Sequence, residues 1–337
     1  MKRTTTHFIF AVLPMVLLVF VISCTKQGPQ GTPGVDADAI CGTCHNVSSD
    51  IVAKQTQFGA SGHATGSTFE RNSADCAVCH TSQGFIERIE NGTDEIAGDV
   101  SNPVHINCRT CHNIHLDYEE SDYDLTTTAA VSLWIDGSIF DFGSGNICAN
   151  CHQPRVPSPK PEIGGEDVTI PSPYWGLHHG PQSTMLSGTG GYEIAGSMSY
   201  TNSQHTNLVT EGCVKCHMPD PYGNQAGGHT FNMTYSYHGH DAVWQEGCTD
   251  CHTDGNELET LIADASDNLD VLLVDLKAKL ITEGVLDSTD HVIPGTHSSL
   301  LAGAAMNYLF VLEDRSKGAH NYKYAEALLS NSIEALP

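Results

Sequence analysis

Basic side chains are scarce in this 337-residue chain, which has 15 Lys and Arg against 40 Asp and Glu and a formal net charge of −25. A surface so negative repels the phosphates of nucleic acid and of anionic lipid, so both are poor partners. Basic partner proteins, cations or a mineral surface remain compatible with the charge. The acidity also has a simpler explanation, because a net charge far from zero keeps a protein soluble.

Apolar residues are also few, at 39% of the chain, and aromatic residues make up only 7%. This content is low for a chain of this length to build a large core from its own side chains. Long apolar runs are lacking after residue 24. No later segment is therefore predicted to cross a membrane.

The first 24 residues combine a basic start, an apolar run from Phe8 to Ser23 and a cysteine at Cys24. This order is typical of an export signal, and the run is short for a bilayer crossing. The string "VISC" resembles the bacterial lipobox, which implies cleavage before Cys24 and lipid attachment to its sulfur. A plain signal peptide with an incidental cysteine is the alternative.

These features predict a lipoprotein signal peptide at residues 1–23, followed by a lipid anchor and flexible tether at residues 24–38. The tether has glycines at a three-residue period and is expected to be extended and solvated. We expect an exported protein that is lipid-anchored at the outer membrane, on either its periplasmic or its cell-surface face.

Twelve of the 13 cysteines belong to one repeated string, Cys-x-x-Cys-His. Histidine occupies 19 of 337 positions, so chance would place it after all six pairs with a probability on the order of 10^-8. The paired cysteines are Cys41 and Cys44, Cys76 and Cys79, Cys108 and Cys111, Cys148 and Cys151, Cys213 and Cys216, and Cys248 and Cys251. The histidines that follow them are His45, His80, His112, His152, His217 and His252.

This string is typical of covalent haem attachment, in which both thiols add to the haem vinyl groups and the histidine binds the iron. Zinc sites also use Cys-x-x-Cys pairs, but zinc has no reason to require histidine at the next position every time. Disulfides in an exported chain would not explain the histidines either. The sequence therefore predicts six covalently attached haem c groups.

The fold class that we expect is mainly α with long loops, a multihaem cytochrome c fold organised around six covalent haems. Glycine and proline, at 32 and 15 residues, interrupt most long periodic elements before the carboxy-terminal part. We expect residues 39–255 to form a hexahaem domain in which the porphyrins supply much of the core and order the loops.

Residues 256–282 differ, because their leucines recur at spacings of three and four, which predicts an amphipathic helix. Two further helical stretches follow, "THSSLLAGAAMNYLFVLEDR" and "HNYKYAEALLSNSIEAL". Residues 256–337 are thus expected to form a helical bundle packed on the haem domain. Their apolar stripes either pack within the protein, which we favour, or form a dimer interface.

Each haem iron has a sixth position, and histidines outside the motifs and the signal can fill it. They are His63, His105, His115, His178, His179, His205, His229, His238, His240, His291, His297 and His320. Methionine ligates some cytochromes c but is the minority choice here, because only five methionines follow the signal.

The run "CVKCHMP" from Cys213, with His205 before it and His229 in "GGHTF" after it, resembles part of a known family. That family is the pentahaem nitrite reductase and hydroxylamine oxidoreductase superfamily. The last motif and "GAHNYKYAEALL" around His320 add to the resemblance, which covers roughly residues 60 to 337.

The resemblance implies that His205 ligates the last haem, His229 an earlier haem and His320 the penultimate haem. It also implies that His63 is a ligand and that the helix at residues 256–282 is a dimer contact.

The chain departs from that family at the catalytic haem, where the reductases usually carry lysine as the proximal ligand and leave the other face open. All six motifs here end in histidine, and the motif at Cys76 corresponds most nearly to the catalytic one. The segment "GLHHGPQ" either closes this haem through His178 or His179 or leaves polar side chains around an open iron. We favour closure and include His179 in the ligand set.

The string "HINCRTCHNIH" places His105 and His115 on either side of the third motif. Cys-x-x-Cys-His-x-x-His is common in multihaem electron carriers, where the second histidine reaches a neighbouring haem. His115 is our choice for the first haem, with His105 as reserve.

Three functions compete. The favoured one is an electron carrier with six bis-histidine haems, which exchanges electrons with redox proteins of the cell envelope or with an external acceptor. The second is a reductase of a nitrogen or sulfur oxyanion at one open haem, although a negative field would repel such anions. The third is a subunit of an extracellular conductive filament, and both a homodimer and a polymer are compatible with the sequence. No catalytic residue is predicted.

Overall fold

The computed structural model describes residues 42, 45 and 50–337. The predicted signal peptide, the lipid-anchor residue Cys24 and the first-motif cysteines Cys41 and Cys44 lie outside these residues. Asp50–Pro337 forms one compact unit, separate from Met1–Ser49.

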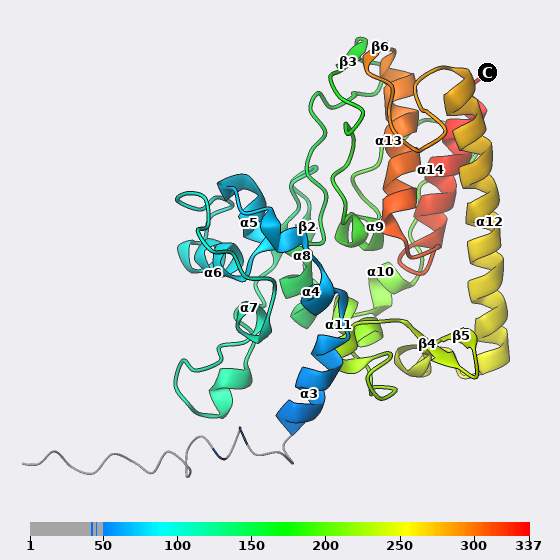
Figure 1. The fold of residues 1–337 in the computed structure, drawn as a ribbon. Helices are drawn as coiled ribbons and strands as arrows, with labels where there is room; N and C mark the ends of the chain where they lie inside the picture. Colours follow the sequence, from blue (N-terminus) through cyan, green and yellow to red (C-terminus); the bar gives the residue numbers. More distant parts are fainter. Residues whose placement is uncertain (1–41, 43–44, 46–49) are drawn as a thin grey trace, which may run out of the picture. The chain divides into compact units, whose positions relative to one another are not determined.

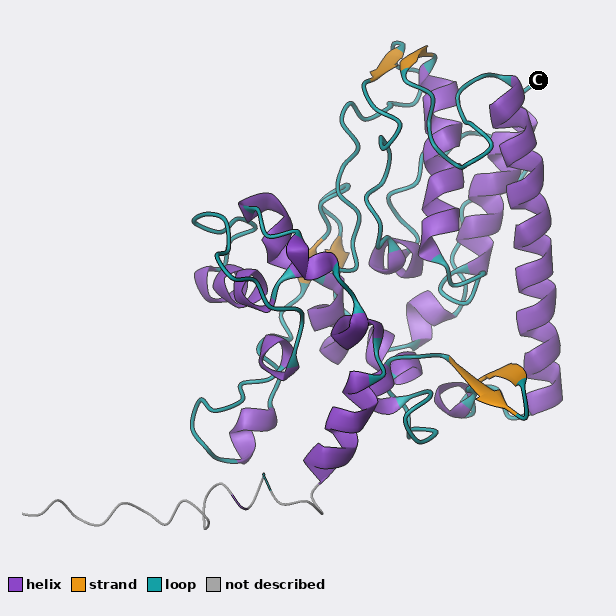
Figure 2. Ribbon diagram, viewed as in Figure 1, coloured by secondary structure: helices purple, strands orange, loops and turns teal. Residues whose placement is uncertain are grey.

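The compact unit is rich in helices, which are joined by long loops (Figure 2). The α-helices are α3 (Asp50–Gly59), α4 (Gly62–Thr65), α5 (Ala74–His80), α6 (Ser82–Asn91), α7 (Cys108–Cys111), α8 (Asn146–Ala149), α9 (Gln182–Ser187), α10 (His205–Leu208), α11 (Gly212–His217), α12 (Gly255–Thr282), α13 (Ser299–Asp314) and α14 (Tyr322–Ala335). The 3-10 turns are η1 (Thr68–Glu70), η2 (Glu120–Tyr123), η3 (Gly143–Gly145), η4 (Gly228–Thr230) and η5 (Glu246–Cys248). No helix of the described part has both the length and the apolar character needed to span a membrane.

The strands are short and form three antiparallel pairs. β1 (Val131–Ser132) pairs with β2 (Ile139–Phe140), β3 (Val168–Ile170) with β6 (Gly295–His297), and β4 (Thr234–Tyr237) with β5 (His240–Val243). The pairing of Thr169 with Thr296 ties the middle of the chain to the segment before α13. A helix-rich fold with short strands and long loops agrees with the sequence prediction at this level.

The cysteine motifs lie on short helical turns. α5 and α11 each contain a whole motif. α7 contains both cysteines of its motif, α8 contains only the first cysteine of its motif, and η5 ends at Cys248. At α7 the side chain of Asn107 accepts from the backbone of Arg109, and Thr110 bonds back to the Asn107 amide, so a capping box starts the helix. A helical turn puts residues three apart on one face, which is what two thioether bonds to one porphyrin require.

Three long helices at the carboxy terminus pack on one another. α12, α13 and α14 run side by side in yellow, orange and red (Figure 1). Leu276 of α12, Phe310 of α13 and Leu328 of α14 are fully buried in the largest hydrophobic cluster. Asp254, Ser298 and Asn321 cap the helix starts by accepting backbone N–H groups.

Asparagines of these helices hold a long extended segment that has little secondary structure of its own. Asn307 accepts from the Tyr192 amide at 2.8 Å and donates to the Tyr192 carbonyl at 2.7 Å. Asn331 does the same for Met198, at 3.0 and 2.9 Å. The sequence analysis expects the porphyrins to hold the loops in place. In this segment, asparagine side chains instead bond to the backbone N–H and C=O groups of Tyr192 and Met198.

Candidate functional site

Five histidines that end a described motif each face a second histidine from elsewhere in the chain. The ring centroids are 6.1 Å apart for His80 and His178, 6.1 Å for His112 and His229, 6.0 Å for His152 and His63, 6.3 Å for His217 and His320, and 6.1 Å for His252 and His205.

This spacing fits one metal ion between two rings. Two metal–nitrogen bonds of about 2 Å, made along a line between two imidazoles, separate the ring centres by about 6 Å. A haem iron needs two axial ligands, because the porphyrin supplies the other four. Each pair also lies beside its two motif cysteines, so the residues present fit a covalently attached haem with two histidine ligands. The described residues contain no cluster of three or more metal-ligating side chains.

Backbone carbonyls fix the orientation of several of these rings. The Nδ1 atoms of His112, His217 and His205 lie 2.7, 2.9 and 2.7 Å from the carbonyl oxygens of Tyr123, Phe231 and Ala319. A carbonyl only accepts, so Nδ1 carries the proton and Nε2 keeps its lone pair for a metal.

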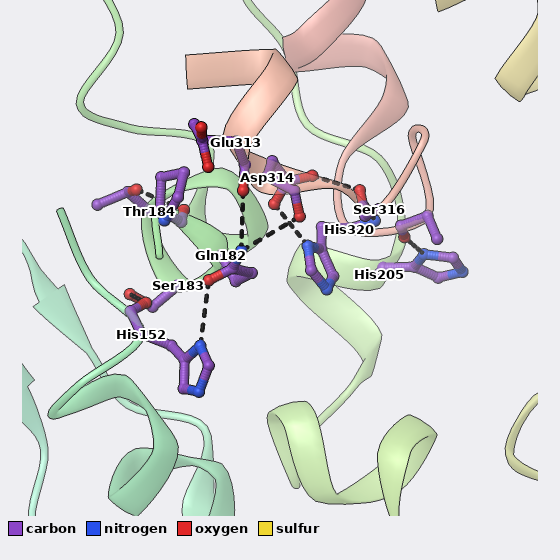
Figure 3. A network of polar contacts seen from close by, with 11 residues as sticks. His152, Gln182, Ser183, Thr184, His205, Glu313, Asp314, Ser316 and His320 are labelled. Atoms are coloured by element: carbon purple, nitrogen blue, oxygen red, sulfur yellow. Dashed lines mark hydrogen bonds and ion pairs between the residues drawn. The ribbon is translucent and has the colours of Figure 1, made fainter. Parts of the chain in front are cut away.

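The turn at the end of α13 orients two further rings through side chains (Figure 3). Nδ1 of His152 lies 3.2 Å from Oε1 of Gln182, whose Nε2 donates to the carbonyls of Glu313 and Asp314 at 3.1 and 3.3 Å. Nδ1 of His320 lies 2.7 Å from Oδ1 of Asp314. One turn of chain therefore positions rings from two different histidine pairs.

Burial favours the neutral, ligating form of three of these rings. It lowers the pKa of His63, His178 and His229 to about 4, and neighbouring positive charge adds a smaller effect in the same direction. For His320 burial is the largest single influence and also lowers the pKa, but the charge and hydrogen bond of Asp314 together with the Cys213 thiol outweigh it, so the pKa lies above its ordinary value.

The motifs lie next to one another through their cysteines, none of which forms a disulfide in the described part. The Cys79 thiol interacts with that of Cys151, and the Cys213 thiol with that of Cys148. The turn before Cys248 lies against Cys216, because a Cβ atom at Gly247 would lie 3.1 Å from the Cα atom of Cys216. The second motif thus adjoins the fourth, the fourth adjoins the fifth, and the fifth adjoins the sixth.

Glycines permit these approaches. A Cβ atom at Gly145 would lie 2.9 Å from the backbone nitrogen of Cys213, and one at Gly247 would lie 2.6 Å from the carbonyl oxygen of Lys215. Real Cβ contacts are longer than this, so a side chain at either position would push two motif turns apart.

His178 rather than His179 lies opposite His80, which differs from the choice of His179 in the sequence analysis, and the ligand of this haem stays a prediction. The Nδ1 of His179 instead lies 2.8 Å from Oε2 of Glu313, and its side chain is 75% exposed. Adjacent residues in the loop point in different directions, and Gly176 and Gly180 on either side have φ values of 139° and 106°.

His205, His229 and His320 face the sixth, third and fifth motif histidines, which is the distribution that the family resemblance implies. His63 faces the fourth motif histidine, a partner that the sequence analysis leaves open. The role of these residues as iron ligands remains a prediction.

The assignment of His115 to the first haem also remains a prediction, because Cys41 and Cys44 lie outside the described residues. The His115 ring stacks on Tyr118 at 5.4 Å, and its φ is 66°. The reserve candidate His105 has its Nδ1 2.6 Å from the carbonyl of Ile106 and lies beside Phe69.

Gln182 and Asp314 are functional residues that the sequence analysis does not identify. Each orients a ring of a histidine pair through a contact between segments far apart in the chain. Neither residue belongs to a spaced motif. The sequence signal for such partners is weak: each ligating histidine needs an acceptor for its Nδ1 proton, but the sequence does not show which residue supplies it.

Comparison with known proteins gives a likeness of fold. No protein-family model and no curated protein matches the chain. The crystal structure of the outer cell wall cytochrome OcwA is similar, with a TM-score of 0.54 and 22% sequence identity. The match covers 83% of this chain and 50% of OcwA, so the chain spans about half the length of that protein. Residues of this chain therefore adopt a fold that is shared with a cytochrome.

Proposed function

We propose that this protein is a c-type cytochrome that carries electrons through six covalently attached haems. The observation that carries the proposal is the set of five histidine pairs with ring centroids 6.0–6.3 Å apart, each with one member directly after a Cys-x-x-Cys pair. Two imidazoles close both faces of an iron, which suits electron transfer better than substrate binding. The fold likeness to the cytochrome OcwA supports the same class.

The adjacency of the motifs supports transfer from haem to haem. Close approaches of the motif turns link the second, fourth, fifth and sixth motifs in a series. Haems attached to adjoining turns lie close to one another. The proposed path thus has a line of four haems.

The proposed location is the cell envelope. The export signal and Cys24 favour lipid anchorage at the outer membrane, and the name of OcwA places that protein in an outer cell wall. The proposed partners are basic redox proteins of the envelope or an external acceptor, because the chain carries a net charge of −25.

A homodimer through α12 is the proposed assembly. Leu261, Val271 and Val274 expose 48%, 58% and 66% of their surface on this helix. A polymer is the competing assembly, and electron microscopy of cell-surface material that showed fibres of this chain would replace the dimer.

Electron paramagnetic resonance of the oxidised, full-length holoprotein tests the carrier function. We expect only low-spin haem signals, and mass spectrometry should show six added haems. A high-spin signal that changes on addition of nitrite or hydroxylamine would overturn the carrier proposal.

A second candidate function, reduction of a nitrogen or sulfur oxyanion, is favoured by one feature of the haem site at Cys76. Within the described residues, no hydrogen bond fixes Nδ1 of His80 or of His178, and His178 keeps exposed surface. Arg71 and Arg155 lie close enough to lower the pKa of His178. An anion that displaced His178 would meet positive charge there. Steady-state assays with nitrite, hydroxylamine and sulfite, with an external chemical reductant that keeps the protein reduced, test this function.

A further inference from the structure

The buried carboxylate of Asp314 makes a direct contact with one of the paired histidines. Asp314 is 4% exposed, and its Oδ1 accepts from Nδ1 of His320 at 2.7 Å. Its Oδ2 accepts from the hydroxyl of Ser316, which also accepts the backbone N–H of His320 (Figure 3). The carboxylate and the ring are therefore held together from two sides.

The other paired rings with an Nδ1 partner in the described chain use neutral acceptors. These acceptors are the carbonyl oxygens of Tyr123, Phe231 and Ala319 and the amide oxygen of Gln182. Asp314 alone among these partners is charged. Hydrogen bonds to a charged acceptor are roughly twice as strong as those between neutral groups.

A charged acceptor changes what the ring gives to a metal. A carboxylate draws the Nδ1 proton toward itself, so more electron density is available at Nε2. Stronger donation and a nearby negative charge both stabilise ferric iron over ferrous iron, and hydrogen bonding is one of the means by which proteins set haem potentials. Burial strengthens the effect, because the interior screens charge less than water does.

We propose that Asp314 gives the haem at Cys213 and Cys216 the lowest reduction potential of the five haems with described histidine pairs. The inference rests on the proposed haem at that motif. Reduction there adds one electron to the iron, the proton stays on Nδ1 of His320, and no bond forms or breaks. Asp314 acts through His320 and is thus a positioning residue.

This ranking has a consequence for the path of electrons, since the fifth motif lies between the fourth and the sixth. A low potential at the fifth haem makes electron transfer to it from either neighbouring haem unfavourable. Electrons would then occupy the neighbouring haems, and transfer between the fourth and sixth haems would have to pass through this unfavourable site.

The test is the variant Asp314→Asn in the full holoprotein, followed by redox titration with electron paramagnetic resonance detection. We expect one low-spin haem to titrate at a more positive potential than in wild type, with its resonance shifted, while the other haems keep theirs. Asp314→Glu, which keeps the charge, should restore most of the difference.

The matched control is Glu313→Gln, which removes one negative charge from the neighbouring residue without altering an Nδ1 bond of a paired ring. It should shift the potential of the fifth haem much less than Asp314→Asn does, because no hydrogen bond to a paired ring changes. An Asp314→Asn profile that matches this control, or that matches wild type, overturns the proposal. Loss of haem number or of low-spin character in the wild-type protein would instead refute the proposed function.

A second variant decides the matter if Asp314→Asn does not retain its haems. Ser316→Ala removes a donor from Oδ2 of Asp314 and leaves the carboxylate more available to His320. The potential of that haem should then fall, which is opposite to the effect of general disruption by solvent entry. An unchanged or raised potential would refute the role of Asp314.

Discussion

At the residue scale, His178 and His179 show how two identical side chains in one loop make different contacts. His178 faces His80, while Nδ1 of His179 lies 2.8 Å from Oε2 of Glu313, which Arg315 also contacts at 3.2 Å. The two neighbouring rings therefore contact different parts of the protein.

Replacement of His178 by alanine should open one haem. We expect His178→Ala to convert one haem from low-spin to high-spin and to let the reduced protein bind carbon monoxide at that haem, because the other pairs stay closed. Optical and paramagnetic resonance spectra measure both changes.

His179→Ala is the matched control for this substitution, since it removes the same side chain one position along the loop. It should leave every haem low-spin. A high-spin signal in His179→Ala but not in His178→Ala would reverse the assignment that the ring geometry favours.

The residues of the site differ in how far the sequence predicts them. The spacing Cys-x-x-Cys-His predicts the proximal histidines because it is a local pattern. Neither spacing nor composition distinguishes His178 from His179, whose roles depend on the backbone dihedrals of one loop. The pairing of His63 with His152 and the contact of Asp314 with His320 depend on tertiary packing.

At the element scale, α12 has one buried face and one exposed face, and substitutions on the two faces should differ in their effect on stability. Leu276 is fully buried, whereas Val274 is 66% exposed. Leu276→Ala should lower the free energy of unfolding by about 2–5 kcal/mol, because it leaves a cavity between the carboxy-terminal helices. Chemical denaturation followed by far-ultraviolet circular dichroism measures the change.

Val274→Ala is the control for Leu276→Ala in dilute protein, where the proposed α12 dimer is dissociated, with an expected change within about 0.5 kcal/mol. Equal effects of the two substitutions would contradict the orientation of α12. A large effect of Val274→Ala that depends on protein concentration would instead indicate that this face is covered in a dimer.

The close approach of motif turns gives a second test at this scale. Gly247→Ala would force its methyl group against the carbonyl of Lys215, and overpacking of this kind costs about 1–3 kcal/mol. Separation of the fifth and sixth motifs should also slow electron exchange between their haems. Denaturation and the kinetics of haem reduction measure the two effects.

Gly98→Ala is the matched control, because no atom lies within 4 Å of the added methyl group. It should change neither stability nor kinetics. If Gly247→Ala behaves in the same way, the two turns are not in tight contact.

The elements illustrate why periodicity predicts some of the fold and not the rest. Residues 256–282 form a helix that agrees closely with α12, because its apolar face repeats along the chain. The segment held by Asn307 and Asn331 has no repeat to detect. Its conformation follows from hydrogen bonds that exist only after α13 and α14 have formed.

At the scale of the whole molecule, charge determines how the protein meets its partners. The net charge of −25 should accelerate encounter with a basic redox protein at low ionic strength. We expect the second-order rate of electron exchange with a basic cytochrome to fall steeply as the salt concentration rises from about 0.01 M to 0.2 M. Added salt shortens the Debye length and so screens the attraction between the two proteins. Stopped-flow absorbance measures this rate.

An uncharged reductant serves as the comparison, since its rate should vary little with salt. A basic partner whose rate also stays constant would show that the overall charge does not steer the reaction. A rate that rises with salt would indicate that the contact surface is itself positive.

The position of His320 after α13 has a consequence for how the proposed cytochrome matures. His320 reaches His217 only after α13 has ended and the turn through Asp314 and Ser316 has closed around it. Synthesis delivers this segment after all of the cysteine motifs. If the fifth haem is bound as proposed, its iron would gain its second histidine only after every motif has been made, and a chain cut before α13 would carry a chemically reactive, open haem.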